Sequence, residues 1–167
     1  MADDRPFLLY VDREQWTCHD SEGRKRCLMR REMVKHFLWG KGFNPAPKEG
    51  LLKLPDTALT ERPYVLMITH LDFDPDTTLF QYHKSLERIR GIRQAHPSLP
   101  VIVYTGAMEC SPGATDYELT GAGVAGIVRK SCDYHIRTAV DQDCVELEKV
   151  IDALLPSIAP GLAPLNR

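Results

Sequence analysis

The chain has 167 residues, of which 43% are hydrophobic and 26% are charged, and its formal net charge is −2. This length is enough for a single domain with a substantial core, and the charge gives no overall bias toward nucleic acid or an anionic membrane. No apolar run approaches the roughly 18 residues of a membrane-spanning helix, and the acidic N-terminus lacks the basic start of a signal peptide. The five cysteines include no Cys-x-x-Cys pair and predict reduced thiols. We therefore expect a cytoplasmic protein that binds neither membranes nor nucleic acid.

The first part of the chain begins with a buried strand and a helix. The apolar residues of 7–11 predict a strand that ends at Asp12, and the polar residues 12–24 predict a loop. From about 26 to 39 apolar side chains recur at helical spacing, and two glycines follow. The members of this apolar stripe are Met29, Met33, Val34, Phe37 and Leu38. The next segment, 43–47, carries two prolines, so a strand there must lie at an edge of the sheet.

The rest of the chain alternates strands with helices. Continuous apolar runs predict three more buried strands, and helical spacing predicts a helix after each of them. The predicted strands are 64–69, 101–104 and 125–128, and the predicted helices are 78–95, 114–121 and 138–156. Asp76 or Thr77 is expected to cap the helix that follows the acidic loop 70–76. The residues 157–167 are rich in proline and predict a flexible C-terminal tail.

This alternation predicts an α/β fold: a doubly wound, five-stranded parallel sheet with helices on both faces. Two strand orders are common in such sheets. The flavodoxin-like order 2-1-3-4-5 fits better, because it places the proline-containing second strand at an edge. We expect a single domain over residues 1–156.

Two polar residues close neighbouring strands of this predicted sheet. Thr105 follows the strand at 101–104, and Lys130 follows the strand at 125–128. In an open parallel sheet, residues at the carboxyl ends of the strands line the ligand crevice. A hydroxyl and an ammonium group together suit an anionic ligand, so the sequence predicts a site at this edge.

Three segments resemble the receiver domain of two-component response regulators. Residues 8–14 resemble its first strand and acidic cluster, the run 96–106 resembles its fourth strand, and the run 121–131 resembles its fifth strand. The resemblance covers roughly residues 6–155 and implies the receiver-like, flavodoxin-like fold.

The resemblance also implies a pocket that binds Mg²⁺ and an aspartate that accepts a phosphoryl group. By this resemblance Asp12 is a metal ligand, with Glu14 substituting for the second acid of the family. Thr105 is the switch hydroxyl, and Lys130 is the ammonium group that contacts the phosphate. The family's phosphoacceptor is the last residue of the third strand, and here that position holds Thr69.

Several residues depart from the family's pattern. Arg13 stands where a second acid is usual, and Ile127 stands where a switch aromatic is usual. Ser131 replaces the proline that follows the lysine, so no cis peptide is expected there. Asp72 is the alternative phosphoacceptor if the loop after the third strand is shifted. We therefore interpret the chain as a stand-alone atypical receiver, or pseudo-receiver, that acts as a signalling and protein-interaction module without normal aspartate phosphorylation.

Three functions stay open at this point. The first is the interaction module, with a histidine kinase, a downstream effector or a second copy of the chain binding near residues 107–150. The second is a phosphorylatable response regulator of a phosphorelay that uses Asp72. The third is a small flavodoxin-like enzyme with chemistry from His70, Asp12 or a cysteine. We favour a protein that is not an enzyme and has no certain cofactor.

Two further patterns favour ordinary structural interpretations. The basic residues between 24 and 35 predict a solvated helix face. The glycines Gly121, Gly123 and Gly126 spell GxGxxG, but a predicted helix precedes them and a predicted strand follows. A dinucleotide-binding loop needs the reverse order, so these glycines are expected to end a helix and form a tight turn.

Overall fold

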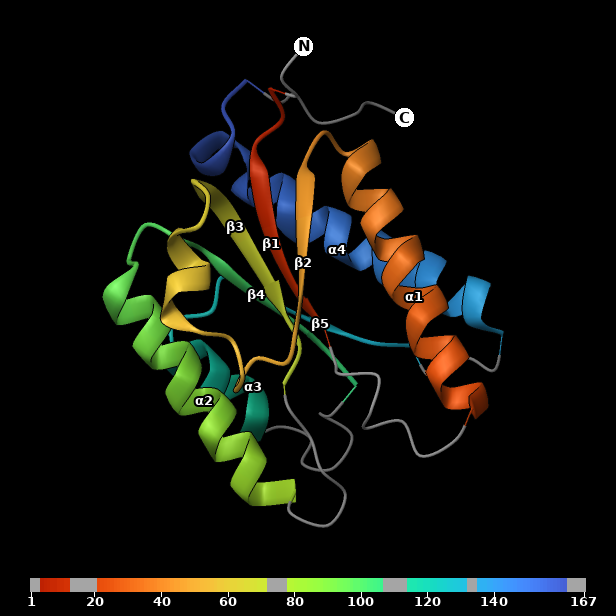
Figure 1. Ribbon diagram of the computed structural model, residues 1–167, viewed down its shortest axis with the longest axis horizontal. Coiled ribbons are helices and arrows are strands. Elements are labelled where there is room, and N and C mark those ends of the chain that lie inside the picture. The colour runs from red at the N-terminus through yellow and green to blue at the C-terminus, as the bar shows by residue number, and fades with distance from the viewer. Residues whose placement is uncertain (1–3, 13–20, 72–77, 107–113, 132–134, 162–167) are drawn as a thin grey trace.

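The structure is a computed structural model that describes residues 4–12, 21–71, 78–106, 114–131 and 135–161. Five parallel strands form one sheet in the order β2-β1-β3-β4-β5, and helices cover both of its faces (Figure 1). The predicted α/β class, the parallel sheet and the order 2-1-3-4-5 are therefore confirmed. Within the described residues, no helix combines the length and the apolar character needed to cross a bilayer.

The elements follow one another as the alternating pattern predicted. The strands are β1 (Phe7–Asp12), β2 (Asn44–Glu49), β3 (Tyr64–Thr69), β4 (Val101–Thr105) and β5 (Gly126–Arg129). The helices are α1 (Ser21–Gly40), α2 (Thr78–Ala95), α3 (Ala114–Gly121) and α4 (Ile136–Ile158), with the short 3₁₀ helix η2 (Asp56–Thr60) between β2 and β3. The expected cap at Asp76 or Thr77 lies outside the described residues.

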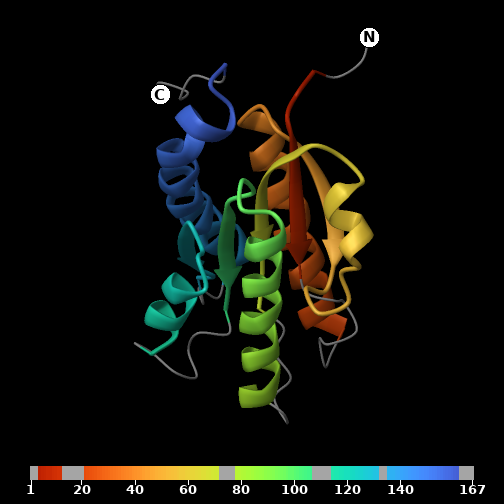
Figure 2. The ribbon, with the colours of Figure 1, turned by 90° about the vertical axis from the view of Figure 1, so that its left-hand side faces the viewer.

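The hydrophobic core has two halves, one on each face of the sheet. Leu9 and Val11 of β1 pack with residues of η2, α2 and α3, whereas Leu8 and Tyr10 pack with residues of α1 and α4. Figure 2 shows the same layers after a quarter turn, with α2 in front of the sheet and α4 to its left. Side chains alternate between the two faces of the sheet along each strand, and these core residues therefore tell which side chains at the ends of the strands face α1 and α4.

The edge strand β2 carries its prolines on the side away from β1. Asn44 N donates a hydrogen bond to Pro6 O, and Gly50 N donates to Asp12 O, both over 2.9 Å. Backbone amides alternate in direction along a strand, so the even-numbered amides of β2 face β1. Pro45 and Pro47 therefore occupy positions whose amides would point outward, and proline is tolerated there because no hydrogen bond of the sheet is lost.

Helix α1 differs from its prediction in two ways. It begins at Ser21, so part of the predicted loop 12–24 is helical. Val34 and Leu38 are buried as expected, but the predicted stripe member Met29 is 44% exposed. The buried side of the helix instead continues one turn earlier through Arg30, which is four residues before Val34.

The last helix is longer than predicted. Helix α4 runs two residues past the expected boundary at 156, to Ile158, and Ala159 after it is buried. Pro156 lies inside the helix and does not end it. The turn between α3 and β5 has the predicted order, with Gly123 at a φ of 87°. Glycine adopts this left-handed conformation without strain, so the GxGxxG pattern serves the turn.

Candidate functional site

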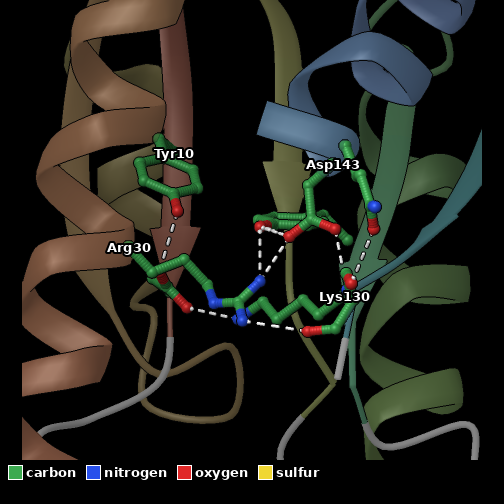
Figure 3. A network of polar contacts seen from close by, with 8 residues as sticks. Tyr10, Arg30, Lys130 and Asp143 are labelled. Carbon is green, nitrogen blue, oxygen red and sulfur yellow. Dashed lines mark hydrogen bonds and ion pairs between the residues drawn. The ribbon is translucent and has the colours of Figure 1, made fainter. Parts of the chain in front are cut away.

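The carboxyl ends of β1 and β5 meet in an ion pair. Lys130 Nζ lies 3.0 Å from Asp12 Oδ1, and Tyr10 Oη donates a hydrogen bond of 2.8 Å to Asp12 Oδ2. The Lys130 ammonium also lies 4.9 Å from the centre of the Tyr104 ring. Asp12 is buried, so its charge is compensated within the chain by a lysine and a tyrosine hydroxyl. Figure 3 shows the labelled Tyr10 and Lys130 approaching this region from β1 and from the end of β5.

The two predicted hydroxyl residues lie at the ends of their strands and are buried. Thr69 ends β3 beside Val11 and Val103, and its Oγ1 donates to His70 O over 2.9 Å. Thr105 ends β4, where its Oγ1 accepts a 3.4 Å hydrogen bond from Leu71 N. By strand alternation both threonines continue the side of the sheet that packs on η2, α2 and α3.

Asp12 and Lys130 continue the opposite side, toward α1 and α4. Asp12 comes two residues after Tyr10 in β1, and Lys130 comes two residues after Val128 in β5. His70 N donates to Val11 O over 3.1 Å, so β3 keeps its ladder one residue beyond Thr69. The same alternation puts the buried His70 on the side of Asp12 and Lys130. Thr69 stays the prediction for the phosphoacceptor position, with Asp72 as its alternative, and His70 is the residue of β3's extended ladder that lies on the side of Asp12 and Lys130.

A second, larger polar network joins α1 to α4 through the middle of this site. The Arg30 guanidinium of α1 forms an ion pair with Asp143 of α4, and its Nη1 also donates to Tyr104 Oη over 3.3 Å. Tyr104 Oη in turn donates to Asp143 Oδ2 over 2.5 Å. The exposed fractions of the two charged side chains are 13% for Arg30 and 1% for Asp143. Figure 3 shows Arg30 reaching across from α1 toward Asp143.

The same network holds Ser131, the second residue after β5. Ser131 N donates a 2.7 Å hydrogen bond to Asp143 Oδ1, and Ser131 O accepts one of 3.1 Å from Arg30 Nη2. A proline at this position has no N–H and cannot make the first of these bonds. No peptide bond of the described residues is cis, as the serine predicted. Ser131 thus ties the end of β5 to both helices.

Burial and the neighbouring charges shift the pKa values of the network in consistent directions. Burial, followed by the charge of Asp12, raises the pKa of Tyr10 well above its ordinary value. Burial is also the largest reason why the pKa of Tyr104 is raised, with Asp143 adding to it. Burial alone would lower the pKa of Arg30, but Tyr104 and Asp143 raise it. The tyrosines are therefore neutral donors and the arginine is charged at any ordinary pH.

The basic segment of α1 is only partly the solvated face that its composition predicted, because two of its arginines are largely buried. Arg30 is bound to Asp143, and the largely buried Arg31 pairs with Glu49 of β2 over 2.8 Å. Lys35 does pair on the surface with Glu32 of the same helix. The prediction was wrong for the two arginines because charged side chains on a helix are buried when another element supplies the opposite charge.

The predicted metal ligand Asp12 is the part of the expected Mg²⁺ site that the structure describes. A Mg²⁺ site needs several oxygen ligands, and the two Asp12 oxygens accept hydrogen bonds from Tyr10 and Lys130. No group of three or more His, Cys, Asp or Glu side chains that suits a metal ion occurs in the described part of the chain. Glu14 and Asp72, the predicted second ligand and alternative phosphoacceptor, lie outside the described residues.

Comparison with known proteins finds similar folds but no similar sequence family. No family model matches the sequence, and no curated protein matches it. Several solved structures, in contrast, have a fold similar to that of this chain. A response regulator from Thermotoga maritima is 19% identical with a TM-score of 0.55, over 88% of this chain and 98% of that one. The Salmonella typhimurium RcsB response regulator is 19% identical with a TM-score of 0.58, over 95% of this chain and 67% of that one.

A CheY-like response regulator receiver domain protein from Methanospirillum hungatei shows the same likeness. It is 13% identical with a TM-score of 0.53, over 90% of this chain and 99% of that one. At these identities the similarity concerns the fold. The chain has a receiver-like fold, as its strand order and its structural neighbours show and as the sequence resemblance predicted.

Proposed function

We propose that this receiver-like domain is a pseudo-receiver: a protein-interaction module that does not use normal aspartate phosphorylation. The observation that carries the proposal is the ion pair between Asp12 and Lys130. The acid that the resemblance assigns to a metal and the lysine that it assigns to a phosphate instead satisfy each other. Tyr10 donates a hydrogen bond to the other oxygen of this carboxylate.

The Arg30–Asp143 network supports the same proposal. Receiver switching requires the segments after β4 and β5 to respond to a new negative charge at the site. Here Ser131, the second residue after β5, already has hydrogen bonds to the charged side chains of Arg30 on α1 and Asp143 on α4. A domain with its charges satisfied in this way presents a constant surface rather than a phosphorylation-dependent one.

We propose further that this surface is formed by α3, β5 and α4, and that it binds a kinase, an effector or a second copy of the chain. Tyr117 on α3 is 85% exposed, which is unusual for a large aromatic side chain and is typical of interfaces. Next to it, Asp116 and Arg129 form an exposed ion pair over 3.0 Å. Sedimentation across a concentration series, with Tyr117→Glu as the variant, tests self-association through this surface. A monomer at every concentration would leave only the heterologous partners.

Phosphorylation is tested by incubation with acetyl phosphate and Mg²⁺, followed by intact-mass measurement. The expected result is an unmodified chain. The competing function is a phosphorylatable response regulator that uses Asp72. It predicts the added mass of one phosphoryl group that disappears in Asp72→Asn, and this result would overturn the pseudo-receiver proposal.

A further inference from the structure

The two helices on one face of the sheet leave a groove between them. It has a volume of about 560 Å³ and is lined by one side of α1, including Met33 and Phe37, and one side of α4. Val140, Cys144 and Val145 line it from α4, and Val145 is 51% exposed. The groove is thus an apolar surface that remains open to solvent. It runs along α4 from 140 to 148, about 12 Å, which equals two to three turns of a helix.

The charged residues of this groove are acidic. Glu32, Asp141 and Glu148 line it, and no lysine or arginine is among the described residues that do. Lys35 offsets Glu32 on the surface, but the buried Lys41 is shared by Glu148 and Asp152 and neutralises only one of these two acids. The groove therefore has an apolar floor and a net negative border.

The pKa of the Cys144 thiol, which lines the groove, is consistent with this negative charge. The pKa of Cys144 is raised to about 12, first by burial and then by the charges of Asp143, Asp141 and Glu148. Arg30 lowers it, but by less than these contributions together raise it. A cation placed in the groove would be favoured by the carboxylates that disfavour the thiolate.

We propose that the groove between α1 and α4 is a docking site for an amphipathic helix of a partner protein that carries lysine or arginine beside its apolar face. Two parallel ridges of helical side chains accept a third helix, and apolar anchors at i, i+3 or i+4, and i+7 match the length of the floor. The basic flanks meet Glu32, Asp141 and Glu148, which sets the preference for this partner over an acidic one. This site goes beyond the proposed function, because it lies on the α1 side of α4 rather than on the surface of α3 and β5.

The test uses two synthetic peptides with the same helical leucines, one flanked by lysines and one by glutamates. Fluorescence anisotropy with the complete chain is expected to show at least tenfold tighter binding of the lysine peptide. Val145→Lys is expected to weaken that binding at least tenfold. Glu87→Lys, the control, adds a lysine at an exposed position of α2 on the other face of the sheet and is expected to bind as the native chain does.

Each of the following binding results would overturn the proposal. The proposal that a basic helix binds in the groove is wrong if the two peptides bind equally or if neither binds. It is also wrong if Val145→Lys binds the lysine peptide as tightly as the native chain does. A dimer that dissociates on Val145→Lys would assign the groove to a second copy of the chain. Circular dichroism of the variant establishes that it is folded, which is expected because Val145 is half exposed. A phosphoryl adduct on the native chain would contradict the pseudo-receiver proposal and leave this one standing.

Discussion

Replacing Ser131 by proline should destabilise the domain, although proline is what the receiver family usually has after the lysine. The variant loses the Ser131 N–H that donates over 2.7 Å to the buried Asp143 carboxylate. A hydrogen bond to a charged group is worth about 1.5–3 kcal/mol, and the abandoned acceptor stays buried. The proline ring also restricts the backbone of Lys130. We expect a loss of about 2–3 kcal/mol in the free energy of unfolding and a Tm lower by roughly 4–12 °C.

The matched control is Ser131→Ala. It keeps the backbone N–H and removes the exposed hydrogen bond of 3.0 Å between Ser131 Oγ and Gln142, so its stability should stay within about 0.5 kcal/mol of the native chain. Urea unfolding followed by circular dichroism measures all three chains, with equal m-values required for the comparison. If the proline and alanine variants unfold at the same urea concentration, the contact with Asp143 does not stabilise the fold and the reasoning is refuted.

Two more predictions concern packing and titration. Gly126→Ala should cost about 1–3 kcal/mol, because the new Cβ would lie 2.3 Å from Val150 Cγ1. Thermal melts should show partial rescue by Val150→Ala, and the control Gly91→Ala in α2, where nothing lies within 4 Å, should be neutral or stabilising. The raised pKa of Cys144, about 12 instead of 9, means that the folded state holds this proton more tightly. Its contribution to stability is therefore complete below pH 9 and lost as the pH rises toward 12. At pH 8 the folded chain should hold about a thousandfold less thiolate than the chain in urea, so iodoacetamide should label this thiol about a thousandfold more slowly, as measured by peptide mass; equal rates would contradict the shift.

The strand order could be predicted from the sequence because two independent features agree on it. Alternating strands and helices require a parallel sheet, and the prolines at 45 and 47 require an edge position for the second strand. The ends of the elements were less predictable. The first turn of α1 has no apolar residue, so no apolar spacing marks its start at Ser21. Strand β3 keeps its ladder to His70, which changes the residue that faces Asp12 and Lys130.

The ion pair between Arg30 and Asp143 could not be predicted from either helix alone. Arg30 lies four residues before Val34 on the buried side of α1, and Asp143 lies between Val140 and Leu147 on the buried side of α4. In each helix the charged residue interrupts the row of apolar side chains. The sequence of one helix alone therefore predicts either that its buried side is shorter or that the charged residue is exposed. Only the fold brings the two elements together, so the signal available in the sequence was a pair of opposite charges at buried helical positions.

The prolines of β2 also limit how copies of this protein can come together. An exposed strand with free outward amides can template another chain, as in β-augmentation or fibril growth. Two of the three outward positions of β2 have no amide hydrogen to offer, and Glu49 holds the third. This side of the sheet is therefore closed to added strands, and partners must recognise side chains on the helices rather than backbone at this border.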